Sequence, residues 1–236
     1  LAAGHGGSGG KGPAMRRPPT GIVTSVGWGV GTEVTYVYEG NIHHTGDTVK
    51  WARDELQLFS EYREAESRAA SLSGNGGVYL VPAFSGLGAP HWKHGIRASI
   101  TGMSRSTTAD HIIRAALESV AYQVADVLFQ MVEGGEFEIP AFQVDGGPSR
   151  NRFLMQFLAD ILAVPVRVAE LEEVSARGVA FVAGVATNFW KNEAELKDLV
   201  NPAMVYEPRM SEANREALLA GWRAAVRQVF AGGTGE

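Results

Sequence analysis

The sequence predicts an α/β fold in which helices cover both faces of a mixed sheet. Paired strand signals come first along the chain, and alternating strand and helix signals follow them. The chain has 236 residues, 45% of them hydrophobic, which is enough to bury a sizeable core as one large domain or two small ones. It is expected to fold without disulfides, since it contains no cysteine.

The first 19 residues are expected to be a flexible lead-in. Six of the first twelve residues are glycine and bulky apolar side chains are almost absent, so this segment cannot offset its own ordering entropy. A chain that begins with Leu1 also suggests a fragment or an added tail. The ordered domain is expected at residues 20–231, followed by a frayed tail at 232–236.

Two β-branched and aromatic runs within residues 21–40 flank the turn GVGTE, which indicates a β-hairpin. A helix is expected after Gly46, with Asp47 able to cap it. Apolar residues recur there at helical spacing, namely Val49, Ala52, Leu56 and Phe59.

A second helix is expected at residues 61–72, because the breaker SGNGG follows directly. Short strands are expected at 78–84 and 97–103. A longer helix is expected at 107–131, where one apolar face continues for about seven turns at 3.6 residues per turn. That face consists of Ile112, Ile113, Ala116, Leu117, Val120, Ala121, Val124, Leu128 and Met131.

The chain after residue 140 alternates between strand and helix signals, which favours βα units. Trp190 and Trp222 are interpreted as packing anchors for the last helices. The expected elements are a strand at 141–144, a helix at 150–162, a strand at 164–169, a helix at 175–190 and an amphipathic helix at 212–229.

Gly146 and Gly147 stand where a predicted strand turns directly into a predicted helix. Without a Cβ, such a junction lets a ligand come close to the backbone, and the N–H groups of a helix start suit a phosphate. Pro148 fits the first helical turn, and Asn151, about one turn beyond Gly147, could direct its amide toward a base or ribose. The junction is therefore a candidate nucleotide site. The alternative is a tight turn that binds nothing.

Charge and composition argue against several classes of partner. The net charge is −5 and no basic run is longer than Arg16–Arg17, so a nucleic acid is not an expected partner. No apolar run approaches the length of a membrane span, so no membrane contact is expected. The absence of cysteine fits a reducing compartment, and the cytoplasm is the expected location.

The histidine pairs His43–His44 and His91/His94 could suggest a metal site. Adjacent strand residues point to opposite faces and no carboxylate cluster lies near the second pair in the sequence, so histidines of the core or of loops are the preferred interpretation. Glu118, on the long helix, could be a general base. A structural or solvated carboxylate is preferred, because its helix otherwise has the pattern of core packing.

Five segments spread over most of the chain have the character of family motifs. They are VDGGPSRNRFLMQF with ADIL (144–162), ASITGM with HIIRAALE (98–118), VPAFSGLGAPHW (81–92), EGNIHHTGDTVKWARDEL (39–56) and EVSARGVAFVAG (173–184). Together they resemble the carbohydrate kinases of the FGGY family, and some of them resemble glycerol kinases more than xylulose or ribulose kinases. The resemblance covers about residues 20–230 and implies a ribonuclease-H-like domain of the actin-like ATPase superfamily.

Four site residues follow from this resemblance. It implies that Gly147 and Asn151 contact adenosine and that Gly46 approaches the nucleotide with its backbone. Lys50 stands where bacterial glycerol kinases commonly have Gln, so its ammonium could meet a phosphate or point into solvent. Arg150 could add a phosphate contact, but an exposed residue at the helix start is preferred.

The resemblance covers only the C-terminal half of such a kinase. ATP is the implied nucleotide, with Mg²⁺ held mainly through the absent N-terminal half, which would also bind glycerol or a similar polyol and supply the general base. This chain is thus assigned no catalytic residue and no metal ligand, and by itself it is expected to be inactive. The Gly-Thr-Gly phosphate loop of the family is not recognisable. A homo-oligomer remains open.

Two alternatives remain from the sequence. One is a non-catalytic truncated relative of the kinases that serves in binding or assembly. The other is a kinase for a different sugar or polyol such as xylulose, because Lys93 and His94 replace the acidic residue and proline usual after the tryptophan of this segment.

Overall fold

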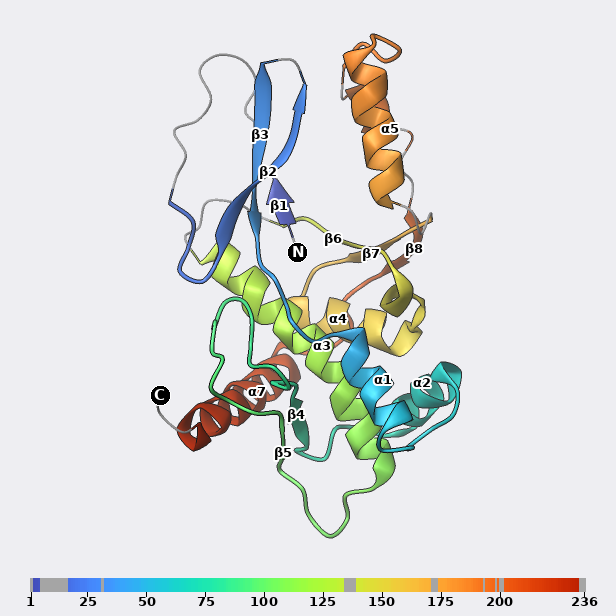
Figure 1. The fold of residues 1–236 in the computed structure, drawn as a ribbon. Coiled ribbons are helices and arrows are strands. Elements are labelled where there is room, and N and C mark those ends of the chain that lie inside the picture. The colour runs from blue at the N-terminus through green and yellow to red at the C-terminus, as the bar shows by residue number, and fades with distance from the viewer. Residues whose placement is uncertain are drawn as a thin grey trace.

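The computed structural model describes residues 2–4, 17–30, 32–133, 139–170, 174–192, 194–197, 199 and 202–233. Its strands form three small sheets, and the long helix α3 (Ala109–Val132) crosses the middle of the molecule (Figure 1). Helices α1 (Gly46–Asp54) and α2 (Tyr62–Ser71) lie along one side of α3. The C-terminal helix α7 (Glu212–Gly232) and the short strands β4 (Tyr79–Val81) and β5 (Ser99–Thr101) lie below it in this view.

The predicted hairpin is confirmed. Strands β2 (Val23–Val30) and β3 (Glu33–Glu39) pair antiparallel, with a register shift between Val26 and Trp28. β1 (Ala2–Gly4) pairs antiparallel with β3, so these three residues have regular structure although they fall within the segment expected to be a flexible lead-in. Antiparallel pairing satisfies their backbone groups without any large side chain. The lead-in residues at 1 and 5–16 and the tail residues at 234–236 lie outside the described residues.

A mixed sheet is present, as predicted. β6 (Phe142–Val144) runs parallel to β7 (Val166–Ala169), and β8 (Pro202–Tyr206) adds an antiparallel edge strand. The parallel pair is joined through helix α4 (Arg152–Leu162), which confirms the predicted βα alternation. β8 had no recognised sequence signal. Two further helices are α5 (Val174–Ala186) and the short α6 (Ala194–Lys197).

The predicted helix after Gly46 is shorter than expected. α1 ends at Asp54, and Gln57 has a φ of 52°, a left-handed conformation that no continuous helix contains. Phe59, expected on the apolar face of this helix, is still buried, but it reaches the core from the connecting segment. Asp47 lies inside the first turn, and the N-cap residue is Thr45.

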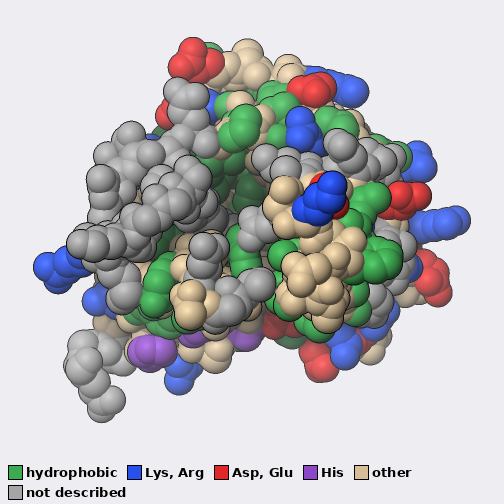
Figure 2. All heavy atoms as spheres, turned by 90° about the horizontal axis from the view of Figure 1, so that it is seen from above, with side chains coloured by type: hydrophobic (Ala, Val, Ile, Leu, Met, Phe, Trp, Pro, Cys, Tyr) green, Lys and Arg blue, Asp and Glu red, His purple; other side chains and the backbone are tan. Residues whose placement is uncertain are grey.

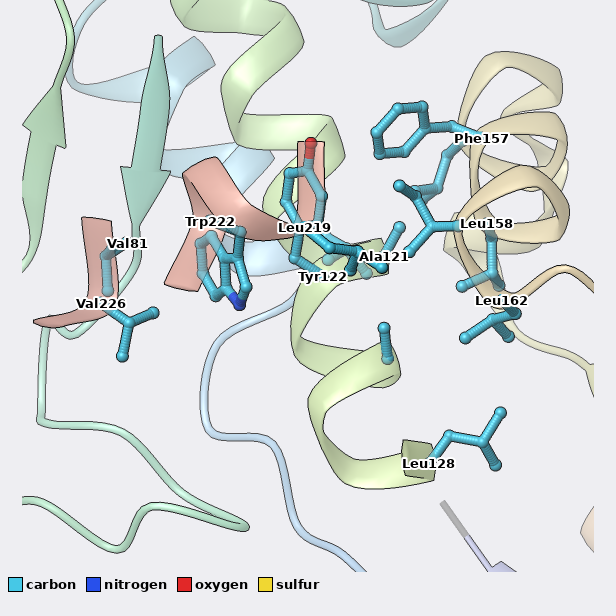
Figure 3. Close-up of a cluster of buried hydrophobic side chains, with 14 of the residues drawn as sticks. Val81, Ala121, Tyr122, Leu128, Phe157, Leu158, Leu162, Leu219, Trp222 and Val226 are labelled. Atoms are coloured by element: carbon cyan, nitrogen blue, oxygen red, sulfur yellow. The ribbon is translucent and has the colours of Figure 1, made fainter. Parts of the chain in front are cut away.

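The main core forms between α3, α4 and α7 (Figure 3). Tyr122 of α3 stacks on Trp222 of α7 with ring centroids 5.2 Å apart, and both side chains are almost fully buried. The Trp222 indole N–H donates to the Asp126 carboxylate at 2.8 Å, which satisfies its polar atom. Trp222 is thus a packing anchor, as predicted. Trp190 packs edge-on against Phe181 of α5.

The end of the molecule formed by the hairpin and α5 has a different character. Several apolar side chains are exposed there, including Val26 at 62% and Val179 at 71%, and none of the α5 residues whose side chains are described is buried. Seen from above, hydrophobic side chains are visible on this face among charged groups (Figure 2). The buried core therefore lies below the hairpin, around α3. None of the described helices is both long enough and apolar enough to cross a bilayer.

Glu118 is a buried structural carboxylate, not a solvated one. Its side chain is 1% exposed, and Oε1 accepts a hydrogen bond from Arg114 Nε at 2.6 Å. Arg114 also donates to Leu72 O at 2.6 Å, beyond the C-terminus of α2. Burial raises the pKa of Glu118, and Arg114 opposes that rise. The pair therefore ties α3 to the end of α2 through the partly buried Arg114 cation.

We expect Glu118→Gln to lower the free energy of unfolding by about 3 kcal/mol, because it leaves the poorly exposed Arg114 without a countercharge. Urea denaturation at pH 7 measures this loss. Glu216→Gln, at a surface carboxylate 52% exposed, is the control and should change stability by less than about 0.5 kcal/mol. A loss below about 1 kcal/mol in Glu118→Gln would contradict the structural role.

Candidate functional site

The turn after β6 leaves its backbone open. Gly146 has a φ of 82°, a conformation that favours glycine, and a Cβ built on either Gly146 or Gly147 would have no atom within 4 Å. Both glycines are exposed. The chain then forms the 3₁₀ turn η1 (Gly147–Arg150), with Pro148 near its start, instead of entering the α-helix directly as predicted. The turn is held by Ser149, whose N–H and Oγ–H both donate to Gly146 O, at 3.1 and 2.7 Å.

Asn151 occupies a different place from the one predicted. Because η1 comes first, Asn151 is the N-cap of α4 and does not lie one turn up that helix. Its Oδ1 accepts the N–H of Leu154 at 2.9 Å. This capping bond does not use the amide nitrogen, so the NH₂ group could still donate to a ligand at the turn.

The start of α1 faces the same turn, although it is about one hundred residues earlier in the sequence. A Cβ added at Gly46 would lie 3.2 Å from Cγ of Pro148. The predicted residues Gly46 and Gly147 are therefore brought close together, and Asn151 caps the helix that follows. Only a residue without a side chain fits at Gly46 without moving Pro148.

Two predicted cationic candidates lie at the surface. Lys50 is exposed one turn after Gly46, and its charge contributes to lowering the pKa of Asp54, after the larger effect of the Arg53 hydrogen bond. Arg150 is exposed at the end of η1. Lys50 thus lies on the helix that begins at Gly46, and Arg150 on the turn that begins at Gly147.

The described histidines lie in loops or at helix ends, and their rings contact other side chains and, at His44 and His111, backbone N–H groups. His91 Nε2 lies 3.2 Å from Asp126 Oδ2, and the ring of His43 stacks on that of His94 with centroids 6.3 Å apart. His44 contacts both Asp47 and Ser85, an arrangement that no spacing in the sequence indicates because Ser85 is 41 residues away. Among the residues that the structure describes, no three His, Cys, Asp or Glu side chains are grouped so as to hold a metal ion.

A model of the FGGY family of carbohydrate kinases, C-terminal domain, matches residues 8–187. The chain belongs to this family. The resemblance stated from the motifs is thereby confirmed. The match begins inside the predicted lead-in, and the domain boundaries at 19/20 and 231/232 stay predictions.

Several curated relatives of this FGGY domain are glycerol kinases. The chain is 49% identical over 209 residues to glycerol kinase 1 of Thermotoga maritima, covering 89% of the chain and 42% of the relative. It is 47% identical over 206 residues to the glycerol kinase of Azotobacter vinelandii, with coverages of 87% and 41%. The chain thus spans about two fifths of the length of the relatives that it matches.

Solved structures have the same fold. The glycerol kinase of Plasmodium falciparum with ADP superimposes with a TM-score of 0.83 at 30% identity, over 90% of this chain and 42% of the other. A gluconate kinase from Lactobacillus acidophilus gives a TM-score of 0.81 at 19% identity, over 92% and 44%, which shows the fold alone. The predicted kinase fold of the actin-like ATPase superfamily is confirmed.

We expect Asn151→Ala to lower the free energy of unfolding by about 1 kcal/mol, because the first turn of α4 loses its capping acceptor. Asn151→Asp keeps an acceptor oxygen at the cap, now from a carboxylate, and should stay within about 0.5 kcal/mol of the wild type. Urea denaturation of both variants measures the difference. Equal losses in the two variants would show that the capping bond is not what stabilises this turn.

Proposed function

We propose that the chain is the ATP-binding half of a glycerol kinase, whose complete form transfers the γ-phosphoryl group of ATP to a primary hydroxyl of glycerol. The observation that carries this proposal is the approach of Gly46 to Pro148, beside the open turn at Gly146 and Gly147, where an added Cβ meets no protein atom within 4 Å. The names of the relatives support glycerol as acceptor, and the similar structure from Plasmodium falciparum was solved with ADP.

In this proposal the residues of the chain bind and orient the nucleotide. Adenosine lies against the backbone of Gly147, with Gly46 on the facing side, and the NH₂ group of Asn151 donates a hydrogen bond to it. Lys50, exposed one turn beyond Gly46, offers a point charge to a phosphate. When bound with ATP, Mg²⁺ would neutralise phosphate charge. In this proposal its protein ligands lie mainly in the half of the enzyme that the chain does not span.

The chemistry requires more than this half. Phosphoryl transfer depends on positioning the attacking hydroxyl in line with the γ-phosphate and on neutralising the charge there. The polyol site and the general base are assigned to the part of the relatives that this chain does not span. We also propose the cytoplasm as its location, because a chain without cysteine suits a reducing compartment.

We expect Gly147→Leu to abolish measurable ADP binding by the chain while leaving its stability almost unchanged. The added side chain would occupy the space where the nucleotide approaches, whereas a Cβ there meets no atom of the protein within 4 Å. Isothermal titration calorimetry with ADP and urea denaturation give the two measurements.

Gly178→Leu is the matched control, because a Cβ at that exposed position in α5 also meets no atom within 4 Å. It should bind ADP as the wild type does. If Gly147→Leu binds as tightly as the wild type, the nucleotide does not use this turn. If the wild-type chain binds neither ADP nor ATP, the proposal fails and a non-catalytic assembly module becomes the better interpretation.

We expect the isolated chain to phosphorylate glycerol no faster than a control without protein. A coupled assay for ADP release, with glycerol and with xylulose as acceptors, measures the rate. Turnover of glycerol by this chain would show that the reacting groups lie within it. Turnover of xylulose alone would also replace glycerol as the proposed acceptor.

A further inference from the structure

The residue two positions before Gly46 is held at both nitrogens of its ring. His44 Nδ1 lies 2.5 Å from Asp47 Oδ2, and Nε2 lies 2.7 Å from Ser85 Oγ. The backbone N–H of Ser85 also points at Nε2, at 3.2 Å. A backbone N–H can only donate, so Nε2 is an acceptor and the ring proton sits on Nδ1, facing the carboxylate.

The first turn of α1 depends on these contacts. Its N-cap residue, Thr45, has no side-chain capping bond and an irregular backbone conformation, with φ −129° and ψ −101°. Instead, Oδ1 of Asp47 accepts the N–H of Thr45 at 2.7 Å. The Asp47 carboxylate therefore organises the start of α1 through Oδ1, while its second oxygen, Oδ2, contacts His44.

The long helix fixes the same residue from the core side. Gln123 of α3 is 6% exposed, and its Nε2–H donates to the carbonyl oxygen of His44 at 2.8 Å. The His44 ring also packs nearly perpendicular to the ring of Phe84, with centroids 5.4 Å apart. His44 thus joins α1, α3 and the loop at 83–87 immediately before the predicted nucleotide contact.

We propose that His44 is a positioning residue for the nucleotide, acting by holding the start of α1 so that Gly46 stays against the turn at Pro148. This inference rests on the proposed nucleotide site. His44 itself need not touch the ligand. Its effect passes through the backbone of Thr45 and Gly46 and through the Asp47 carboxylate.

The negative charge of Asp47 keeps its contacts with His44 and Thr45 intact near neutral pH. Burial raises the pKa of Asp47, but the hydrogen bonds that it accepts, first from His44 and then from Thr45, contribute to lowering the pKa below its usual value. Because this pKa is lowered in the folded state, Asp47 stabilises the fold above its unfolded pKa. That stabilisation is lost as the pH falls through its folded pKa. Asp47 therefore stays ionised and able to accept both bonds at pH 7.

The order Ser85, His44, Asp47 also matches the nucleophile, base and orienting acid of a hydrolase. The backbone N–H groups of Ser85 and of the residue after it are already engaged, however. The N–H of Ser85 donates to His44, and the N–H of Gly86 donates to Ala83 O at 3.2 Å. This turn therefore offers no preorganised pair of donors for an oxyanion, which favours a positioning role over nucleophilic catalysis.

The first test is ADP affinity of His44→Phe, measured by calorimetry on the whole chain at pH 7. Phenylalanine keeps an aromatic ring, larger than imidazole, against Phe84 but can make neither hydrogen bond. We expect the dissociation constant to rise about fivefold to tenfold, the scale of one or two lost hydrogen bonds. His94→Phe makes the same chemical change at a histidine that stacks on His43, and it should leave the constant within about twofold.

A double-mutant cycle separates positioning from general stability. Ser85→Ala removes the hydroxyl that contacts His44 Nε2. Because His44→Phe already breaks this contact, the double variant His44→Phe/Ser85→Ala should bind ADP no more weakly than His44→Phe alone. His44→Gln, which keeps an acceptor for the N–H of Ser85, should recover part of the affinity. Thermal unfolding of each variant shows whether the protein is folded at the temperature of the titration.

The outcomes distinguish this inference from the proposed function. If the wild-type chain binds ADP and His44→Phe binds it equally well, the positioning role is overturned while the nucleotide site stands. Equal weakening in His94→Phe, or losses that simply add in the double variant, would also overturn it. If His44→Phe does not fold, Ser85→Ala decides, and unchanged affinity there is the overturning result. A wild-type chain without ADP binding overturns both proposals.

Discussion

The burial of helix α3 is the constraint on which the rest of the structure depends. One side of it packs on α4 and α7, where Tyr122 stacks on Trp222. Another side faces α1 and α2, and there the Arg114–Glu118 pair reaches the end of α2. A helix with so many buried side chains gains its stability from packing rather than propensity. The small sheets around it are too short to form a core by themselves.

The candidate site takes its geometry from this arrangement. α1 and α4 both pack on α3, so the start of each is placed by a common support. Gly46 opens one of these helices, and the turn at Gly147 leads into the other. A close approach of 3.2 Å between Pro148 and an added Cβ at Gly46 is thus a result of helix packing in the core, expressed at the surface where a nucleotide would bind. The carbonyl of His44, held by Gln123, is the polar link between the two regions.

Most of the fold could be predicted from local patterns. The long helix is recognisable because its apolar face repeats over many turns, and the hairpin because two β-branched runs flank a glycine-rich turn. The end of α1 and the 3₁₀ turn before α4 could not be predicted, since each depends on backbone conformations at single residues such as Gln57 and Gly146. β8 pairs with β7 as an edge strand, and such short strands have a weak sequence signal.

The sequence by itself determined the family, because motifs spread over most of the chain match it, and it predicted Gly46, Gly147 and Asn151 as nucleotide contacts. Only the tertiary structure decided that the first two lie on facing elements, that Asn151 is an N-cap and that His44 joins Asp47 to Ser85. The physical reason is separation along the chain. Spacing within one helix or strand fixes local neighbours, whereas contacts over 41 or 100 residues exist only once α3 has been buried and its partners have packed around it.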